Sequence, residues 1–150
     1  MNFLIIGLPN VGKTSIYNLI TNSANNIIHE TTGTTRDWHF ASLINNENIH
    51  IYDSPGVIFK KNNTIDKRFE ELLFNIDVFI YVLDYKEKNY TLDKQLLNIF
   101  RKYNKQIILI INKDDNNNQD KDLKHLGSKN YFYISCSHKI GLSNLFEYLN

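Results

Sequence analysis

The chain has 150 residues, of which 42% are hydrophobic, so it is long enough to bury a core of its own. A formal net charge of +1 argues against a strongly basic, nucleic-acid-binding surface over the whole chain and leaves room for a local patch. The single cysteine cannot form an internal disulfide, which favours a reducing compartment. We recognise no signal peptide and no apolar run near the roughly 18 residues that span a bilayer, so we expect a cytoplasmic or organelle-interior protein without a membrane partner.

Strand-like apolar runs alternate with helix-like patterns along the chain. In chain order, the expected strands are 2–6, 38–44, 48–52, 77–83, 106–111 and 131–134. The expected helices are 13–22, 66–75, 91–103, about 119–126 and 141–149. Asparagine is frequent, and most of the Asn pairs lie between these segments, so we interpret them as turns and loops.

The order of these segments predicts an α/β fold. The runs 78–83 and 107–111 are continuously apolar, as in parallel strands that are buried on both faces. The segment 45–48 is typical of a hairpin turn, which makes the strand 38–44 antiparallel to its neighbour. We expect one domain over 1–150 with three layers: a mostly parallel six-stranded sheet with one antiparallel edge strand, and helices on both faces.

Residues 7–14 read Gly-Leu-Pro-Asn-Val-Gly-Lys-Thr, which fits the phosphate-binding P-loop pattern G-x-x-x-x-G-K-[ST]. The motif lies between a strand-like and a helix-like run, the context that it requires. Lys13 can reach the β- and γ-phosphates as a catalytic residue, and Thr14 can offer its hydroxyl to Mg²⁺. The helix N-terminus adds roughly half a positive charge. The expected phosphate-binding residues are Asn10, Val11, Gly12, Lys13, Thr14 and Ser15.

A second motif, Asp53-Ser54-Pro55-Gly56, follows the expected strand 48–52. An Asp at a strand end that faces the P-loop can hold Mg²⁺ through water, and the Gly56 N–H can sense a γ-phosphate. An ordinary turn is the alternative, since D-S-P-G is good turn chemistry, but the P-loop upstream favours the metal site. Position 57, directly after this motif, is Val.

A third motif, Asn112-Lys113-Asp114-Asp115, fits N-K-x-D at the end of the strand 106–111. The Asp115 carboxylate could accept hydrogen bonds from guanine N1–H and N2–H₂, a donor pair that adenine lacks. The Lys113 stem can pack against the base, and Asn112 can tie this loop to the P-loop. In a chain so rich in Asn and Lys the motif alone is weak, and its position after a buried strand is what favours a guanine nucleotide.

Two further segments complete the predicted site. Ser135-Cys136 follows the last expected strand, where a small residue would let its backbone N–H reach guanine O6; Cys136 also fits a buried apolar filler. The segment 31–37, Thr-Thr-Gly-Thr-Thr-Arg-Asp, can supply a second hydroxyl to Mg²⁺ when the γ-phosphate is present, which would make it an order–disorder switch. A plain polar loop is the alternative for 31–37.

In this order and spacing, the five motifs resemble the translation-factor-like branch of P-loop GTPases, and their details resemble the EngA (Der) family of ribosome-assembly GTPases, in particular its first G domain. The likeness lies in 33–37, 90–93 and 135–141, while Asp53-Ser54-Pro55-Gly56 is more similar to the Era family. The resemblance implies the P-loop NTPase G-domain fold and Thr35 as the switch I ligand of Mg²⁺. It also implies a ribosomal subunit or rRNA as partner through the full-length protein, and we expect either an excised G domain or a reduced protein, because an EngA chain continues beyond this length.

Asn10 occupies the P-loop position that helps to coordinate K⁺ in potassium-activated relatives, and a K⁺ there would neutralise charge between the β- and γ-phosphates as an arginine finger does.

Three functional hypotheses remain open at this point. The first is a GTPase switch that changes shape in 23–37 and 54–66, with a nucleotide-dependent dimer as one outcome. The second is a nucleotide-dependent docking module with little hydrolysis. Val57 favours it, because a Ras-like GTPase carries at this position a Gln that orients water, and for the same reason we expect slow hydrolysis. The third is the G domain of an Era-like rRNA-binding or tRNA-modifying GTPase.

Overall fold

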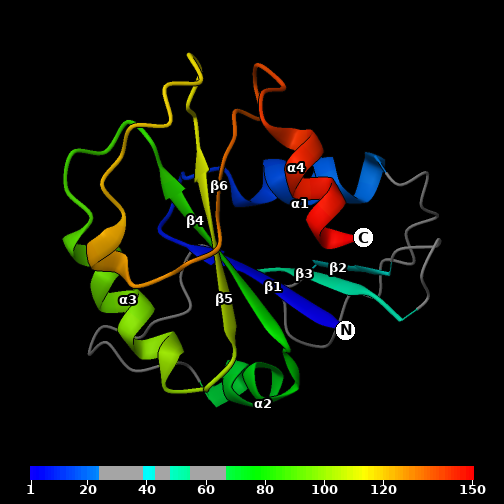
Figure 1. Cartoon of the computed structure of the whole chain (residues 1–150). Coiled ribbons are helices and arrows are strands. Elements are labelled where there is room, and N and C mark those ends of the chain that lie inside the picture. Colours follow the sequence, from blue (N-terminus) through cyan, green and yellow to red (C-terminus); the bar gives the residue numbers. More distant parts are fainter. Residues whose placement is uncertain (24–38, 43–47, 55–66) are drawn as a thin grey trace.

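A computed structural model of the chain describes residues 1–23, 39–42, 48–54 and 67–150, and these build one six-stranded sheet (Figure 1). The strands lie side by side in the order β2-β3-β1-β4-β5-β6. Every neighbouring pair is parallel except β2 with β3, which is antiparallel. The bounds are β1 Asn2–Gly7, β2 His39–Ser42, β3 His50–Asp53, β4 Val78–Asp84, β5 Gln106–Asn112 and β6 Tyr131–Tyr133. The predicted fold class, with its single antiparallel edge strand, is therefore confirmed.

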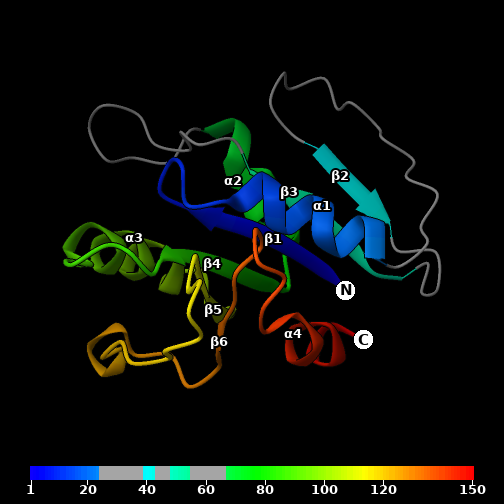
Figure 2. The same cartoon turned by 90° about the horizontal axis from the view of Figure 1, so that it is seen from above.

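Helices cover both faces of the sheet, as Figures 1 and 2 show. One face packs against α1 (Lys13–Ser23) and α4 (Leu142–Leu149), and the other against α2 (Lys67–Asn75) and α3 (Thr91–Arg101). Because successive side chains of a strand point to opposite faces, β4 contributes Ile80 to the first core and Tyr81 to the second. This double coverage explains the continuously apolar sequence of the central strands.

One predicted helix is wrong. Of the expected helix over about 119–126, the structure contains only a 3₁₀ turn at Lys124–Leu126. The Asp114 carboxylate accepts the N–H groups of Asn118 and Gln119, at 3.0 Å each. The Tyr133 hydroxyl accepts the N–H of Lys121 and donates to its carbonyl, at 3.2 and 3.1 Å. These side chains satisfy the backbone groups that an α-helix would use, so the segment has no need of helical hydrogen bonds.

The hairpin turn predicted at 45–48 and the two predicted switch segments lie wholly or mainly outside the described residues. The other predicted helices are present, with bounds that differ by one or two residues. Within the part of the chain that the structure describes, no helix is long and apolar enough to cross a membrane.

The parallel topology brings the polar ends of several strands to one edge of the sheet. Gly7 ends β1, Asp53 ends β3, Asp84 ends β4 and Asn112 ends β5. Asp84 and Asn112 are register partners, so their side chains start from neighbouring positions. In open α/β sheets this carboxyl edge is where ligands bind, and here it is where the sequence motifs converge.

Candidate functional site

The loop between β1 and α1 adopts a shape that its sequence requires. Asn10 and Gly12 both have positive φ angles, of 65° and 100°. A Cβ on residue 12 would lie 2.3 Å from Asn112 Nδ2, so only glycine fits there. The same Nδ2 donates to the Val11 carbonyl at 3.0 Å and fastens the loop to the end of β5. The first turn of α1 begins directly behind, with Ile16 N–H donating to the Gly12 carbonyl at 3.0 Å.

Lys13 turns its side chain back into this loop. Its ammonium donates to the Leu8 carbonyl at 2.7 Å, and the residue is buried. Burial lowers the pKa of the Lys13 ammonium, and the nearby Asp53 carboxylate partly opposes that shift. The Lys13 ammonium thus donates to a neutral carbonyl inside the loop. An anion bound in the loop would be attracted by this positive charge and by the N–H groups at the N-terminus of α1.

Thr14 and Asp53 meet across the sheet edge. The Thr14 hydroxyl donates to Asp53 Oδ2 at 2.9 Å, and the Asp53 side chain is buried. Donation of this proton leaves the Thr14 oxygen lone pairs available to a metal ion, with the carboxylate orienting the hydroxyl from behind. Hydroxyl and carboxylate oxygens are the ligands that Mg²⁺ prefers, so the residues present fit Mg²⁺.

The end of β5 forms the other half of the site. The Lys113 ammonium donates to the Asn10 carbonyl at 2.7 Å and forms an ion pair with Asp84 at 2.6 Å. Asn112 Oδ1 accepts the Cys136 N–H at 3.2 Å, while its Nδ2 holds Val11. The two adjacent residues therefore connect the P-loop, the end of β4 and the loop after β6.

Asp115 presents a carboxylate that is already surrounded by donors. Its Oδ1 accepts the Ser135 hydroxyl at 2.7 Å and lies 3.2 Å from His138 Nδ1. Its Oδ2 forms an ion pair with Lys86 at 3.0 Å. The Ser135 hydrogen bond, followed by the contact with Lys86, lowers the pKa of Asp115 to about 2, so the carboxylate is ionised at neutral pH. Burial raises the pKa of the neighbouring Cys136 thiol to about 11, so the thiol is neutral and fits an apolar wall.

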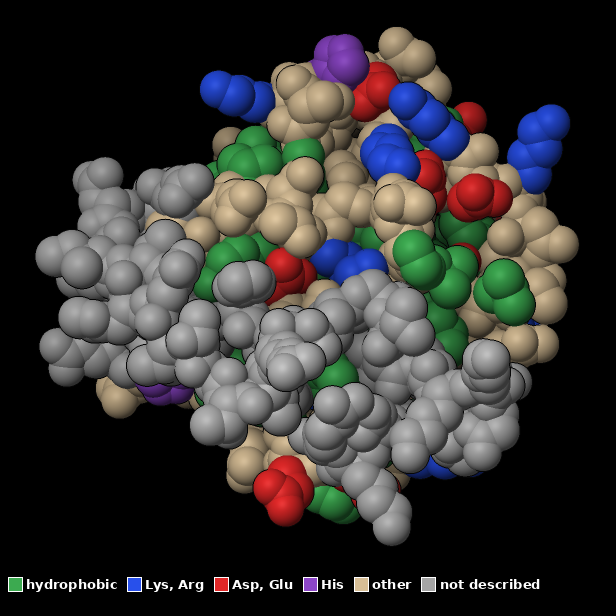
Figure 3. Space-filling view, turned by 180° about the vertical axis from the view of Figure 1, so that it is seen from behind, with side chains coloured by type: hydrophobic (Ala, Val, Ile, Leu, Met, Phe, Trp, Pro, Cys, Tyr) green, Lys and Arg blue, Asp and Glu red, His purple; other side chains and the backbone are tan. Residues whose placement is uncertain are grey.

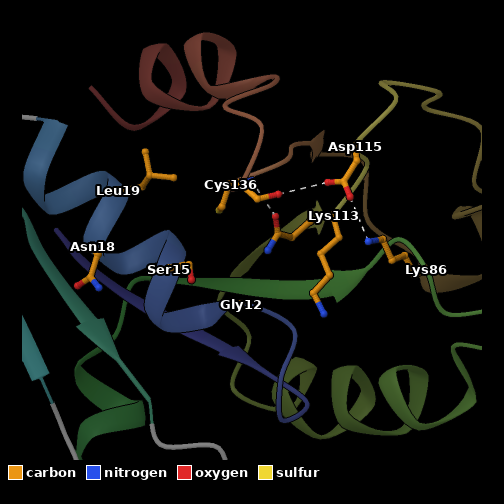
Figure 4. Close-up of a pocket in the computed structure, with 10 residues that line it drawn as sticks. Gly12, Ser15, Asn18, Leu19, Lys86, Lys113, Asp115 and Cys136 are labelled. Atoms are coloured by element: carbon orange, nitrogen blue, oxygen red, sulfur yellow. Dashed lines mark hydrogen bonds and ion pairs between the residues drawn. The ribbon is translucent and has the colours of Figure 1, made fainter.

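Some of these residues line a pocket of about 680 Å³ that opens at the carboxyl edge of the sheet (Figure 4). Figure 4 shows the N-terminal half of α1 on one side of this pocket, with Lys113, Asp115 and Cys136 on the other. Acidic and basic side chains stand next to one another along the same upper edge of the molecule (Figure 3). The pocket is lined by Gly12, Ser15, Asn18, Leu19, Lys86, Asn112, Lys113, Asp115, Cys136 and Ser137.

Most of the predicted site residues therefore lie at one edge. Two of them, Thr35 and Gly56, lie outside the described residues, so their roles remain predictions, as does that of Val57. Sequence reasoning missed Lys86, Asp84, Asp114 and His138. Asp84 had a signal, because it is the polar residue that ends a buried strand. Those that the structure brings together are Asn10, Val11, Gly12, Lys13, Thr14, Ser15, Asp53, Asn112, Lys113, Asp115, Ser135 and Cys136.

Comparison with known proteins agrees with this geometry. The protein GTPase Der of Sulfurihydrogenibium sp. is 32% identical over 151 residues, which is 95% of this chain and 34% of that protein. The chain thus spans about a third of the length of the curated relatives it matches. Among solved structures, the G domain of the T. maritima FeoB iron transporter has a TM-score of 0.70 at 24% identity and covers 99% of this chain and 96% of its own. Era from Aquifex aeolicus, bound to GDP and AlF₄⁻, has a TM-score of 0.65 at 22% identity, covering 99% of this chain and 55% of its own.

The structural neighbours, Era among them, show the fold, and the sequence relatives confirm the predicted likeness to the Der proteins. A family model described as the 50S ribosome-binding GTPase matches residues 2–113, which include the P-loop, the Asp53 motif and the first residues of the N-K-x-D motif. The chain belongs to the 50S ribosome-binding GTPase family.

Proposed function

We propose that residues 1–150 form one guanine-nucleotide-binding domain that binds GTP with Mg²⁺, hydrolyses it slowly and switches between two shapes. The observation that carries the proposal is that the P-loop and the Asp115 carboxylate border one pocket, which Gly12 and Ser15 line at one end and Asp115 at the other. The buried Lys13 ammonium lies at the P-loop end, and the ionised Asp115 carboxylate lies at the other end. A nucleotide places its phosphates and its base at those two ends.

The Asp115 carboxylate is proposed to select the base. Guanine offers N1–H and N2–H₂ on one edge, and an ionised carboxylate offers two acceptor oxygens. Adenine has no such donor pair, so a site built for these hydrogen bonds rejects it. The Lys113 stem is proposed to pack against the base, and the Cys136 backbone N–H is proposed to reach guanine O6, in keeping with the place of both residues in the pocket.

The P-loop end is proposed to carry the reaction. Lys13 and the backbone N–H groups of 10–15 bind the β- and γ-phosphates and stabilise charge that develops there when water attacks in line. Thr14 and Asp53 would hold Mg²⁺, which neutralises part of the phosphate charge when it is bound. Thr35 is proposed as a further Mg²⁺ ligand, and Gly56 as the N–H that contacts the γ-phosphate.

The base assignment is tested by Asp115→Asn with two diphosphates. Asparagine keeps an acceptor for N1–H and offers a donor in place of an acceptor, so it matches xanthine, which carries an oxygen where guanine carries its amino group. We expect the unsubstituted chain to bind GDP and not ADP or xanthosine diphosphate, and the variant to bind xanthosine diphosphate instead of GDP. Equal binding of GDP and ADP by the unsubstituted chain would refute the guanine assignment.

Potassium is proposed as the activating ion at Asn10, which is exposed at the tip of the P-loop. Its backbone conformation has positive φ, so Asn10→Gly removes the side chain without strain, whereas alanine would add strain. We expect faster GTP turnover in K⁺ than in Na⁺, and loss of that difference in Asn10→Gly with GDP binding retained. Equal turnover in the two salts would refute the ion.

The alternative, a docking module with little hydrolysis, is supported by Val57, which cannot orient water as Gln does. Turnover that stays near zero in both K⁺ and Na⁺, together with normal GDP binding, would favour it. In either case the partner proposed is a ribosomal subunit, on the basis of the family that the chain matches. Nucleotide-dependent cosedimentation of the intact gene product with ribosomal subunits tests that partner, and gel filtration with GDP or a GTP analogue tests for a dimer.

A further inference from the structure

The loop between β4 and α3, residues 85–90, contributes one residue to the pocket lining. No sequence motif predicted this contribution. Lys86 lines the pocket from this loop, although most of its side chain is exposed. Its ammonium lies 3.0 Å from Asp115 Oδ2. Figure 4 shows Lys86 on the side of Asp115 that lies away from α1 and Cys136.

The two oxygens of Asp115 are thus held from opposite sides. Ser135 donates to Oδ1 at 2.7 Å, and Lys86 pairs with Oδ2 at 3.0 Å. A carboxylate offers about four lone-pair positions, two on each oxygen. Lys86 therefore takes one position of Oδ2, while Oδ1 also contacts His138 Nδ1 at 3.2 Å and the Ser137 hydroxyl at 3.5 Å. Contacts on both oxygens restrict the rotation of the carboxylate about its Cβ–Cγ bond.

The residues on both sides of Lys86, Tyr85 and Glu87, are held by contacts with another segment. The Lys121 ammonium donates to the Glu87 carbonyl at 2.9 Å and lies 4.9 Å from the centre of the Tyr85 ring. It also lies 5.8 Å from the centre of the Tyr90 ring, a cation–π distance. The Tyr85 hydroxyl donates to Asp120 next to Lys121. The residues before and after Lys86 are therefore both tied to the segment that follows Asp115.

We propose that Lys86 is a positioning residue for base recognition: it aligns the Asp115 carboxylate for the two guanine donors, and Lys121 clamps the loop that carries it. This inference rests on the proposed guanine site. A preformed carboxylate needs no reordering when the base arrives, so the contribution of Lys86 is to affinity and to discrimination among bases. Exposed ion pairs of this kind support effects of about two- to fivefold in an equilibrium constant.

The test compares GDP with inosine diphosphate, which lacks the N2 amino group, by calorimetry at fixed ionic strength. We expect Lys86→Met to weaken GDP binding about two- to fivefold and to weaken inosine diphosphate binding less. The dissociation constant of inosine diphosphate divided by that of GDP should therefore fall. Lys86→Arg should restore both dissociation constants to those of the unsubstituted chain. Lys121→Met should change them in the same direction as Lys86→Met. Lys88→Met, an exposed lysine of the same loop, is the matched control and should change neither.

Different outcomes overturn different statements. If the unsubstituted chain binds GDP and Lys86→Met binds it equally well or more tightly, the positioning role is wrong and the guanine site stands. If Lys86→Met weakens both diphosphates by the same factor, its role is general and not one of alignment, and the proposal is again wrong. If the unsubstituted chain binds neither diphosphate, the guanine site and this inference fail together.

Discussion

A buried hydrogen bond between β4 and α3 gives the sharpest prediction about stability. The Tyr81 hydroxyl donates to Asp93 Oδ1 at 2.8 Å. Tyr81 is fully buried, and Asp93 is only 3% exposed. The substitution Tyr81→Phe removes one hydroxyl and leaves the ring in place, so the packing of the core is retained while the carboxylate loses this donor.

The expected loss follows from the burial of both groups. Hydrogen bonds to charged groups contribute roughly 1.5–3 kcal/mol, so the unfolding constant should rise between about 12-fold and 150-fold. For a domain of this size that corresponds to a fall in Tm of roughly 3–12 °C. Desolvation is the main cause that raises the pKa of Asp93 above its ordinary value of 3.8, and the Tyr81 hydrogen bond opposes that rise.

The pH dependence provides a second, independent check. A carboxyl whose pKa is raised in the folded state contributes most stability below its ordinary pKa and loses it as the pH rises through the raised value. Tyr81→Phe raises that pKa further, so its penalty should be largest at pH 7 and should shrink as the pH falls towards 3.8, where Asp93 is protonated.

Urea unfolding of both chains, at neutral pH and at several acidic values, measures these differences. Tyr131→Phe is the matched control, since Tyr131 is 50% exposed and its substitution should change the free energy of unfolding little. A penalty for Tyr81→Phe below about 0.5 kcal/mol at pH 7, or one that grows on acidification, would refute the reasoning.

Three further predictions concern the pocket wall, two glycine turns and the loop after β5. Cys136, the single cysteine, should react with a thiol reagent at pH 8 about a hundredfold more slowly than an ordinary thiol of pKa 9.0, because its own pKa is about 11. GDP should slow this reaction further, and a fast reaction would contradict the place of Cys136 in the pocket wall. Gly141→Ala should destabilise more than Gly127→Ala in urea unfolding, since both have a φ of 72° but only at residue 141 would a Cβ lie 2.1 Å from the Tyr133 carbonyl oxygen; equal losses would contradict this. Asp114→Ala should weaken GDP binding about tenfold by calorimetry, because it releases the N–H groups that order the loop after Asp115, whereas unchanged binding would show that the loop is ordered without it.

The parts of the fold that could be predicted are those in which local pattern and tertiary contact agree. The continuous apolar runs of β4 and β5 require burial on both faces, and only a covered, parallel sheet provides it. The P-loop could be predicted for the same reason. Residue 12 must be glycine both because its φ angle is positive and because the Asn112 side chain lies too close for a Cβ. The contact of Asn112 with the P-loop was expected from the N-K-x-D motif, although β4 lies between β1 and β5 in the sheet.

The parts that could not be predicted depend on contacts between distant residues. The segment about 119–126 carries helix-compatible side chains, and its two buried leucines, Leu123 and Leu126, also fit the three-residue repeat of a 3₁₀ turn. What decides the outcome is Asp114 and the Tyr133 hydroxyl, which take its backbone groups. Lys86 had no signal either, because one more lysine in a chain with 14 of them is indistinguishable from a solvated surface charge.

The contacts around Asn112 and Lys113 bear on how the two ends of the site act together. Asn112 binds Val11 through its Nδ2 and Cys136 through its Oδ1, and Lys113 binds the Asn10 carbonyl. Both P-loop partners are backbone atoms, so a shift of the N-K-x-D loop moves the main chain of the P-loop and not merely a side chain. A change at the proposed base end of the pocket therefore reaches the proposed phosphate end through two hydrogen bonds. For this reason a substitution that disturbs Asp115 only through Lys86 should weaken base recognition and leave phosphate binding unchanged, whereas one that moves Asn112 should also alter phosphate binding.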